Sequence, residues 1–164
     1  MTHAADRQQA VERAPAQVLA LGSLHGDDRV AWCAADRLRS DGRLAGRVHC
    51  ISSPWDLVDH LRSEGTVLIL DTCRSGTPRG TLVQLSEQQL EKLPVHGTSS
   101  HGGSVAESLR LARALEGLHA DVTVLTVEID EPVPDLDLTL AGREAVTKLE
   151  DAARRFLADR NLMA

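Results

Sequence analysis

Aromatic side chains are almost absent from this chain of 164 residues, which has two tryptophans, one phenylalanine and no tyrosine. Its core must therefore be built from leucine, valine, isoleucine and alanine. The same scarcity removes the aromatic surfaces on which proteins stack single-stranded nucleic acid. A formal net charge of −6 also repels phosphate backbones. We therefore expect no nucleic-acid partner.

Cysteine is scarce as well. Cys33, Cys50 and Cys73 are odd in number and include no CxxC pair, which excludes a disulfide framework and a zinc knuckle and fits a reducing cytoplasm. No apolar run approaches the roughly 20 residues that cross a bilayer, and the polar start does not resemble a secretory signal. We expect a cytoplasmic protein with no membrane partner, with a disordered arm at 1–15 and a single domain at 16–160.

Apolar runs and helical patterns alternate along the rest of the chain. The patterns predict strands at 17–22, 48–51, 66–71, 81–85 and 122–127, and helices at 27–39, 55–62, 88–93, 104–118 and after Thr139. This alternation predicts an α/β fold, a three-layer sandwich whose mostly parallel twisted sheet has helices on both faces.

Polar residues gather where these predicted elements meet. One segment, 22–28, follows the first strand, a second, 71–76, follows the central strand, and a third, 98–103, precedes a helix. Ligands of open parallel sheets bind beyond the carboxyl ends of the strands. We therefore expect the three segments to share one edge of the sheet.

Three residues from these segments form the predicted site. Asp28 and Asp71, held close together, would repel each other and lose hydration, so the pair needs a cation or a shared proton. A neutral imidazole from His101 would complete a set of one histidine and two carboxylates, which leaves positions open for a substrate ligand. We predict a metal site at Asp28, Asp71 and His101, and the residue types do not choose between nickel, zinc, manganese and iron.

Each of these residues also has a structural explanation. Asp27 or Asp28 could cap the first helix, Asp71 could hold a loop as a hydrogen-bond acceptor, and His101 could be a cap or a surface residue. Cys73 follows Asp71 without an evident activating base, which favours a structural thiol. No GxGxxG or P-loop accompanies the glycines, so nucleotide binding is not expected.

The three segments, in this order, resemble the hydrogenase maturation proteases. That family has a first strand and loop ending in an acidic pair, an aspartate after the central strand with a Pro-Gly turn, and a Ser-Ser-His-Gly segment opening a helix. The matching residues here are Leu19–Ser23 with Asp27-Asp28, Asp71 through Pro78 to Gly80, and Ser99-Ser100-His101-Gly102. The resemblance runs from about Val18 to Phe156.

The resemblance implies an endopeptidase that removes the C-terminal peptide of a nickel–iron hydrogenase large-subunit precursor. Asp28, Asp71 and His101 would be its catalytic and metal-contacting residues, and the nickel would be carried by the substrate. The isolated protein could hold another divalent cation in the same place. Two departures stand out: Ser23 replaces the usual asparagine, and Arg29 to Trp32 replace small glycines at the rim.

Two other functions compete with the protease. A relative that has lost cleavage would sense a metal-loaded partner with the same three residues. A phospho-receiver domain would explain an acidic pair and a central aspartate, but it needs a lysine after the final strand. Here that strand is followed by Glu128, and the next lysine, Lys148, lies in the last predicted helix.

Overall fold

The computed structural model describes residues 15–62, 64–92, 104–133 and 137–163. The arm expected at 1–15 lies outside these ranges except for Pro15. The segment 98–103, with His101, lies outside them too.

The described chain contains a five-stranded sheet with the strand order β2-β1-β3-β5-β4. Neighbouring strands run parallel except for the antiparallel pair of β4 and β5. The strands are β1 (Gln17–Leu21), β2 (Val48–Ile51), β3 (Gly65–Cys73), β4 (Leu82–Ser86) and β5 (Ala120–Glu128).

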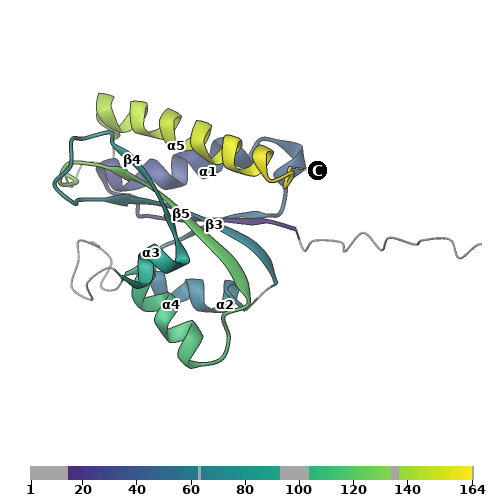
Figure 1. Ribbon diagram of the computed structural model, residues 1–164. Coiled ribbons are helices and arrows are strands. Elements are labelled where there is room, and N and C mark those ends of the chain that lie inside the picture. The colour runs from purple at the N-terminus through teal and green to yellow at the C-terminus, as the bar shows by residue number, and fades with distance from the viewer. Residues whose placement is uncertain (1–14, 63, 93–103, 134–136, 164) are drawn as a thin grey trace, which may run out of the picture.

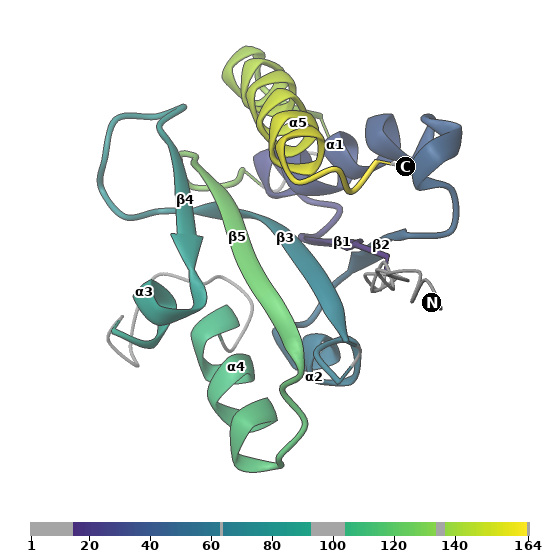
Figure 2. The same ribbon diagram turned by 45° about the vertical axis from the view of Figure 1, so that its right-hand side comes forward.

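Helices cover both faces of this sheet. Helices α1 and α5 lie on one face, and α2, α3 and α4 lie on the other (Figure 1). The helices are α1 (Val30–Arg39), α2 (Leu57–His60), α3 (Glu87–Glu91), α4 (Val105–Ala114) and α5 (Leu140–Asp159). The predicted three-layer α/β fold is therefore confirmed. A view turned by 45° shows β4 at one edge of the sheet, beside β5 (Figure 2).

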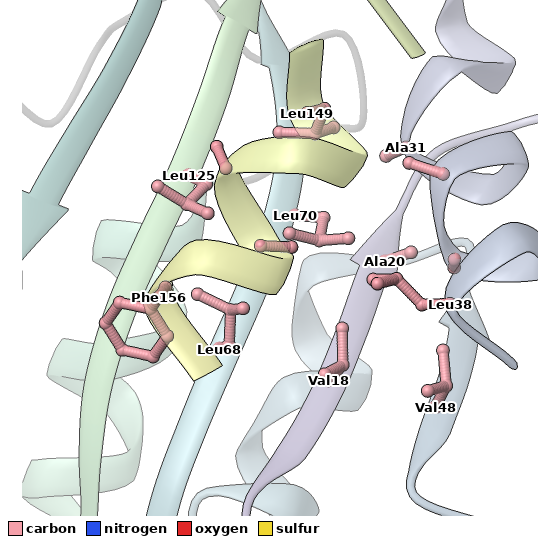
Figure 3. Packing of buried hydrophobic residues seen from close by; sticks show 14 of the residues in the cluster. Val18, Ala20, Ala31, Leu38, Val48, Leu68, Leu70, Leu125, Leu149 and Phe156 are labelled. Atoms are coloured by element: carbon pink, nitrogen blue, oxygen red, sulfur yellow. The ribbon is translucent and has the colours of Figure 1, made fainter. Parts of the chain in front are cut away.

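Side chains alternate along the strands and feed two separate cores. On β3, Leu68 and Leu70 pack under α1 and α5, whereas Val67 and Ile69 pack against α2 and α4. Figure 3 shows the first core, where Phe156 and Leu149 of α5 lie over the aliphatic side chains of the strands. Aliphatic residues fill both layers, as the scarcity of aromatics requires.

One predicted helix is shorter than its pattern suggests. Helix α4 ends at Ala114 rather than at 118, because Glu116 adopts a positive φ of 54° and the N–H of Gly117 turns back to the carbonyl of Ala112 at 2.8 Å. Leu115, which follows the last residue of α4, is consequently 54% exposed. In the described part of the chain, no helix is long and apolar enough to span a membrane.

Two leucines of α5 provide a matched test of this packing. Leu149 is fully buried and Leu140 is 77% exposed. Replacing Leu149 with alanine should lower the free energy of unfolding by about 2–5 kcal/mol, because a cavity opens in the first core. Leu140→Ala should change it by less than about 0.5 kcal/mol. Urea titrations followed by circular dichroism measure both values, and equal losses would contradict this placement of α5.

Candidate functional site at the carboxyl edge of the sheet

The central strand, β3, extends further toward the carboxyl edge of the sheet than its neighbour β1. Strand β1 ends at Leu21, but β3 continues through Asp71 to Cys73 because its pairing with β5 extends to Glu128. The prediction that the central strand ends at Asp71 is therefore wrong by two residues. Asp71 lies in a strand whose neighbour on one side has already turned away into a loop.

The loop after β1 brings Asp28 close to Asp71. The N–H of Thr72 donates to Asp71 Oδ1 at 2.8 Å, and the hydroxyl of Thr72 lies 3.5 Å from Asp28 Oδ1. Asp28 is only 4% exposed, and Asp71 is half-buried. Thr72 thus contacts both carboxylates at the carboxyl edge of the sheet.

Short backbone contacts close the loop that carries Asp28. The N–H of Ser23 reaches the carbonyl of Asp28 at 3.4 Å, and the hydroxyl of Ser23 accepts from the N–H of His25 at 3.3 Å. A side chain at Gly22 would put its Cβ 2.6 Å from that same carbonyl. Ser23 therefore shapes the loop, and Gly22 is required by the close approach of the backbone.

Trp32 is part of this support and not of an open rim. Its indole Nε1–H donates to the carbonyl of Ile51 at the end of β2, at 3.1 Å. Its ring lies against the space where a Gly22 Cβ would stand, and it packs on the first core. Trp32 thus ties the first loop to the end of β2.

Asp27 has a different task from Asp28. Its Oδ1 accepts from the N–H of Thr139 at 2.8 Å, and its Oδ2 accepts from the Thr139 hydroxyl at 2.6 Å. Thr139 in turn caps α5 by accepting from the N–H of Gly142 at 2.9 Å. The suggestion that Asp27 caps the first helix is wrong, because its carboxylate secures the start of α5 instead.

Glu128 is the buried acid of this edge that the sequence analysis did not select. It ends β5, is 4% exposed and accepts hydrogen bonds from the loop after β3. Gly76 N–H donates to its Oε1 at 2.8 Å, while the Ser75 N–H and hydroxyl, the Thr77 hydroxyl and the Cys73 thiol donate to its Oε2. The available signal in the sequence is a polar residue, Glu128, directly after the strand predicted at 122–127. In the sequence analysis this residue serves only as an argument against a phospho-receiver domain, which has a lysine there.

These contacts set the ionisation of Glu128 and Cys73. Burial by itself would raise the pKa of Glu128, but the hydrogen bonds from Ser75, Cys73 and Gly76 lower it to about 2. The pKa of Cys73 is raised to about 11, first by burial, and the neighbouring carboxylate of Glu128 raises it further. Cys73 is thus a neutral hydrogen-bond donor at physiological pH, as the structural explanation of this thiol requires.

His101 itself lies outside the described residues, but the structure describes α4, the helix that follows it. Ser104 caps α4, with its hydroxyl accepting from the N–H of Glu107 at 3.2 Å and its own N–H donating to the Glu107 carboxylate at 2.6 Å. Helix α4 leads into the amino end of β5, so α4 starts near the opposite edge, the one that carries Asp71. His25 is exposed and lies in the first loop.

The described part of the candidate site contributes two carboxylates, Asp28 and Asp71, that both contact Thr72. Within the described ranges, no three histidine, cysteine, aspartate or glutamate side chains are placed to hold a metal ion. Any third ligand would have to come from outside these ranges, where the predicted ligand His101 lies, or from a bound partner.

A cavity of about 380 Å³ opens beside the loop that carries Asp28. Asp27 and Thr139 form one side of it, and residues after β5 form the other. Two of those residues are held by arginines of the loop after β3: Asp130 pairs with Arg79 at 2.6 Å, and Glu131 pairs with Arg74 at 3.3 Å. The cavity therefore opens beside Asp27, next to the loop that carries Asp28.

Comparison with solved structures identifies the fold. The hydrogenase maturating endopeptidase HybD from E. coli aligns with a TM-score of 0.76 at 17% identity, over 90% of this chain and 94% of that one. HybD from Thermococcus kodakarensis, a [NiFe] hydrogenase maturation protease, aligns with a TM-score of 0.69 at 23% identity, over 87% and 99%. At these identities the likeness establishes a shared α/β fold.

The family follows from the sequence. Residues 52–155, more than half of the chain, match the family model of the HycI hydrogenase maturation proteases. The chain therefore belongs to the hydrogenase maturation protease family, a family of hydrolases, as the resemblance of its three segments predicted. No curated protein sequence matches the chain. The family match includes Asp71 and the segment 98–103 and begins after the loop of Asp28.

The contact between Asp27 and the start of α5 can be tested with a double-mutant cycle. A methyl group at Gly142 would lie well inside the van der Waals contact distance of the Asp27 carboxylate. Gly142→Ala should therefore lower the free energy of unfolding by about 1–3 kcal/mol. The same substitution should cost much less when Asp27 is already alanine, because the clash is gone. Equal costs in the two backgrounds would contradict the contact.

The ionisation of Glu128 predicts how stability depends on pH. Its pKa of about 2 lies below the ordinary value of 4.5, so its contribution is complete above pH 4.5 and is lost as the pH falls towards 2. The wild-type protein should lose on the order of 1–3 kcal/mol more than Glu128→Gln across this window. Urea titrations between pH 2 and 6 measure the difference. The exposed Glu131→Gln variant should follow the wild type, and parallel curves for wild type and Glu128→Gln would refute the assignment.

Proposed function

We propose that this protein is a nickel-dependent endopeptidase that removes the C-terminal peptide of a nickel–iron hydrogenase large-subunit precursor in the cytoplasm. One observation carries the proposal. In a chain of this family, Asp28 and Asp71 lie on either side of Thr72 at the carboxyl edge of the sheet. Membership of the family supports the proteolytic activity, and the paired carboxylates support the dependence on a cation.

The three predicted ligands have compatible positions along the chain. Alternation along β3 points Asp71 toward the layer of α2 and α4, as it does Val67 and Ile69. His101 precedes the cap of α4 by three residues, and α4 starts at this same edge. Asp28 would approach from the first loop on the other side of Thr72. The set thus leaves positions free for ligands of the substrate.

Nickel enters the reaction as part of the substrate. The precursor would present its bound nickel at this edge, and Asp28, Asp71 and His101 would complete the coordination and so place the cleavage site. The cation would polarise the scissile carbonyl or activate a water molecule. Water then adds across the peptide bond, which leaves a new carboxylate on the large subunit and a new amine on the released peptide. The cavity beside Asp27 offers room for the chain next to that bond.

This mechanism needs no nucleophile from the enzyme. Cys73, the cysteine nearest to Asp71 in the sequence, is a half-buried thiol that donates to Glu128 at 3.2 Å, and its pKa is raised to about 11. A thiol with such a pKa is protonated at physiological pH and is therefore a poor nucleophile. Replacing Cys73 with serine should preserve cleavage, since a hydroxyl can donate the same hydrogen bond.

The proposal is tested by removing single ligands. Asp71→Ala, Asp28→Ala and His101→Ala should each reduce processing of a nickel-loaded precursor by at least about 100-fold, with an unchanged far-ultraviolet circular dichroism spectrum. Asp121→Ala is the matched control, since that exposed aspartate is the second residue of β5 and lies at the amino end of the sheet. Electrophoresis and intact mass of the large subunit measure the cleavage. Normal processing by Asp71→Ala would sink the assignment.

The same assay separates the protease from a sensing module. The family match begins after the loop of Asp28, and this loop has Ser23 in place of the asparagine of the resembling pattern. If the wild-type protein binds the nickel-loaded precursor without shortening it, the chain is a metal-dependent binding relative. Cleavage that needs nickel in the precursor supports the endopeptidase.

A further inference from the structure

Two histidines lie against each other far from the carboxylates just described. His49 comes from β2 and His60 from the end of α2, and their ring centroids are 5.5 Å apart with a 36° angle between the ring planes. Both side chains are half-buried. Gln17, the first residue of β1, lies beside His60. The pair therefore sits toward the amino ends of the strands, on the opposite side of the sheet from the loop of Asp28.

A hydrogen bond determines which nitrogen of His60 is available. Nδ1–H of His60 donates to Oε1 of Gln17 at 3.1 Å. A neutral imidazole that donates through Nδ1 has its lone pair on Nε2. This is the arrangement in which proteins hold ligating histidines, where one ring nitrogen is fixed by an oxygen acceptor and the other binds the metal.

The surroundings keep His60 neutral while supplying negative charge nearby. Burial lowers the pKa of His60 below its ordinary value, and the adjacent His49 lowers it further, whereas Asp59 and Asp56 act in the opposite direction. Both aspartates are exposed. A neutral imidazole is the form that binds a metal, and nearby carboxylates attract a cation without occupying the lone pair.

The spacing of the rings suits a shared metal ion. With metal–nitrogen bonds of about 2.1 Å, two imidazoles at a roughly tetrahedral angle place their ring centroids about 5 Å apart. The observed 5.5 Å is close to this value.

We propose that His49 and His60 form a second metal site, which binds a borderline divalent cation such as Ni²⁺ or Zn²⁺ independently of Asp28 and Asp71. Within the described residues, no third histidine, cysteine or acidic ligand joins the pair. Two protein ligands therefore leave the remaining positions to water, and binding is weaker than at a closed structural site. Imidazole nitrogen suits nickel, copper and zinc and disfavours magnesium and calcium.

Nickel titration of the full-length protein, followed by NMR of the histidine rings, tests this site. The Asp71→Ala background is used so that binding at the carboxyl edge does not dominate. The ring signals of His49 and His60 should shift or broaden together with one dissociation constant, ahead of the exposed His119. Magnesium at the same concentration should leave them unchanged.

Single substitutions then measure how much each residue contributes to the affinity for nickel at this site. Even hydrogen-bond partners of ligating histidines are worth about 10–100-fold in affinity, so His49→Asn or His60→Asn should weaken nickel binding at this site by at least about tenfold. Gln17→Leu should weaken it less, and His119→Asn should not change it. Undisturbed ring signals of His49 and His60 at saturating nickel would overturn the proposal, even if both variants failed to fold. This experiment measures nickel binding and not processing activity. Its result is therefore independent of the result of the endopeptidase test.

Discussion

The long parallel pairing of β3 with β5 is the constraint on which this site depends. It runs from Gly65 opposite Ala120 to Cys73 opposite Glu128, and it carries β3 past the end of β1. Both strands therefore deliver a carboxylate to the same edge. A slip of one residue would turn Asp71 toward α1 and α5 and would bury a carboxylate in an aliphatic core. Because the register is specified by two buried faces, the position of Asp71 is specified with it.

The carboxyl edge divides its buried acids into two groups. Asp27 and Glu128 accept hydrogen bonds from the backbone and from hydroxyls, and they secure the start of α5 and the loop after β3. These two acids therefore fix the start of α5 and the loop after β3, the two segments that surround the candidate site. Asp28 and Asp71 instead both contact Thr72, at the end of β3. Buried carboxylates are tolerated only with such partners, so the two fixed acids hold the elements around the place where we propose that Asp28 and Asp71 meet a cation.

The histidine pair at the amino end of the sheet is likewise held by contacts between separate elements. His49 and His60 come from a strand and a helix that are eleven positions apart, and Gln17 of a third element orients one ring. Neither histidine has a patterned neighbour in the sequence, so composition and spacing gave no reason to single them out. The pairing arises only because β2 lies beside β1 and α2 packs across both.

The sequence alone determined the layers of this fold and the edge that holds its site. Short continuous runs of aliphatic residues, closed by glycine or a carboxylate, and their alternation with helical patterns predict a mostly parallel sheet. The order of Asp28, Asp71 and Ser99 to Gly102 predicts the family. Only the tertiary structure decided that Asp27 binds Thr139 and that Glu128 organises the loop after β3. Local patterns could not show this, because each contact joins residues more than fifty positions apart and depends on strand register and helix placement.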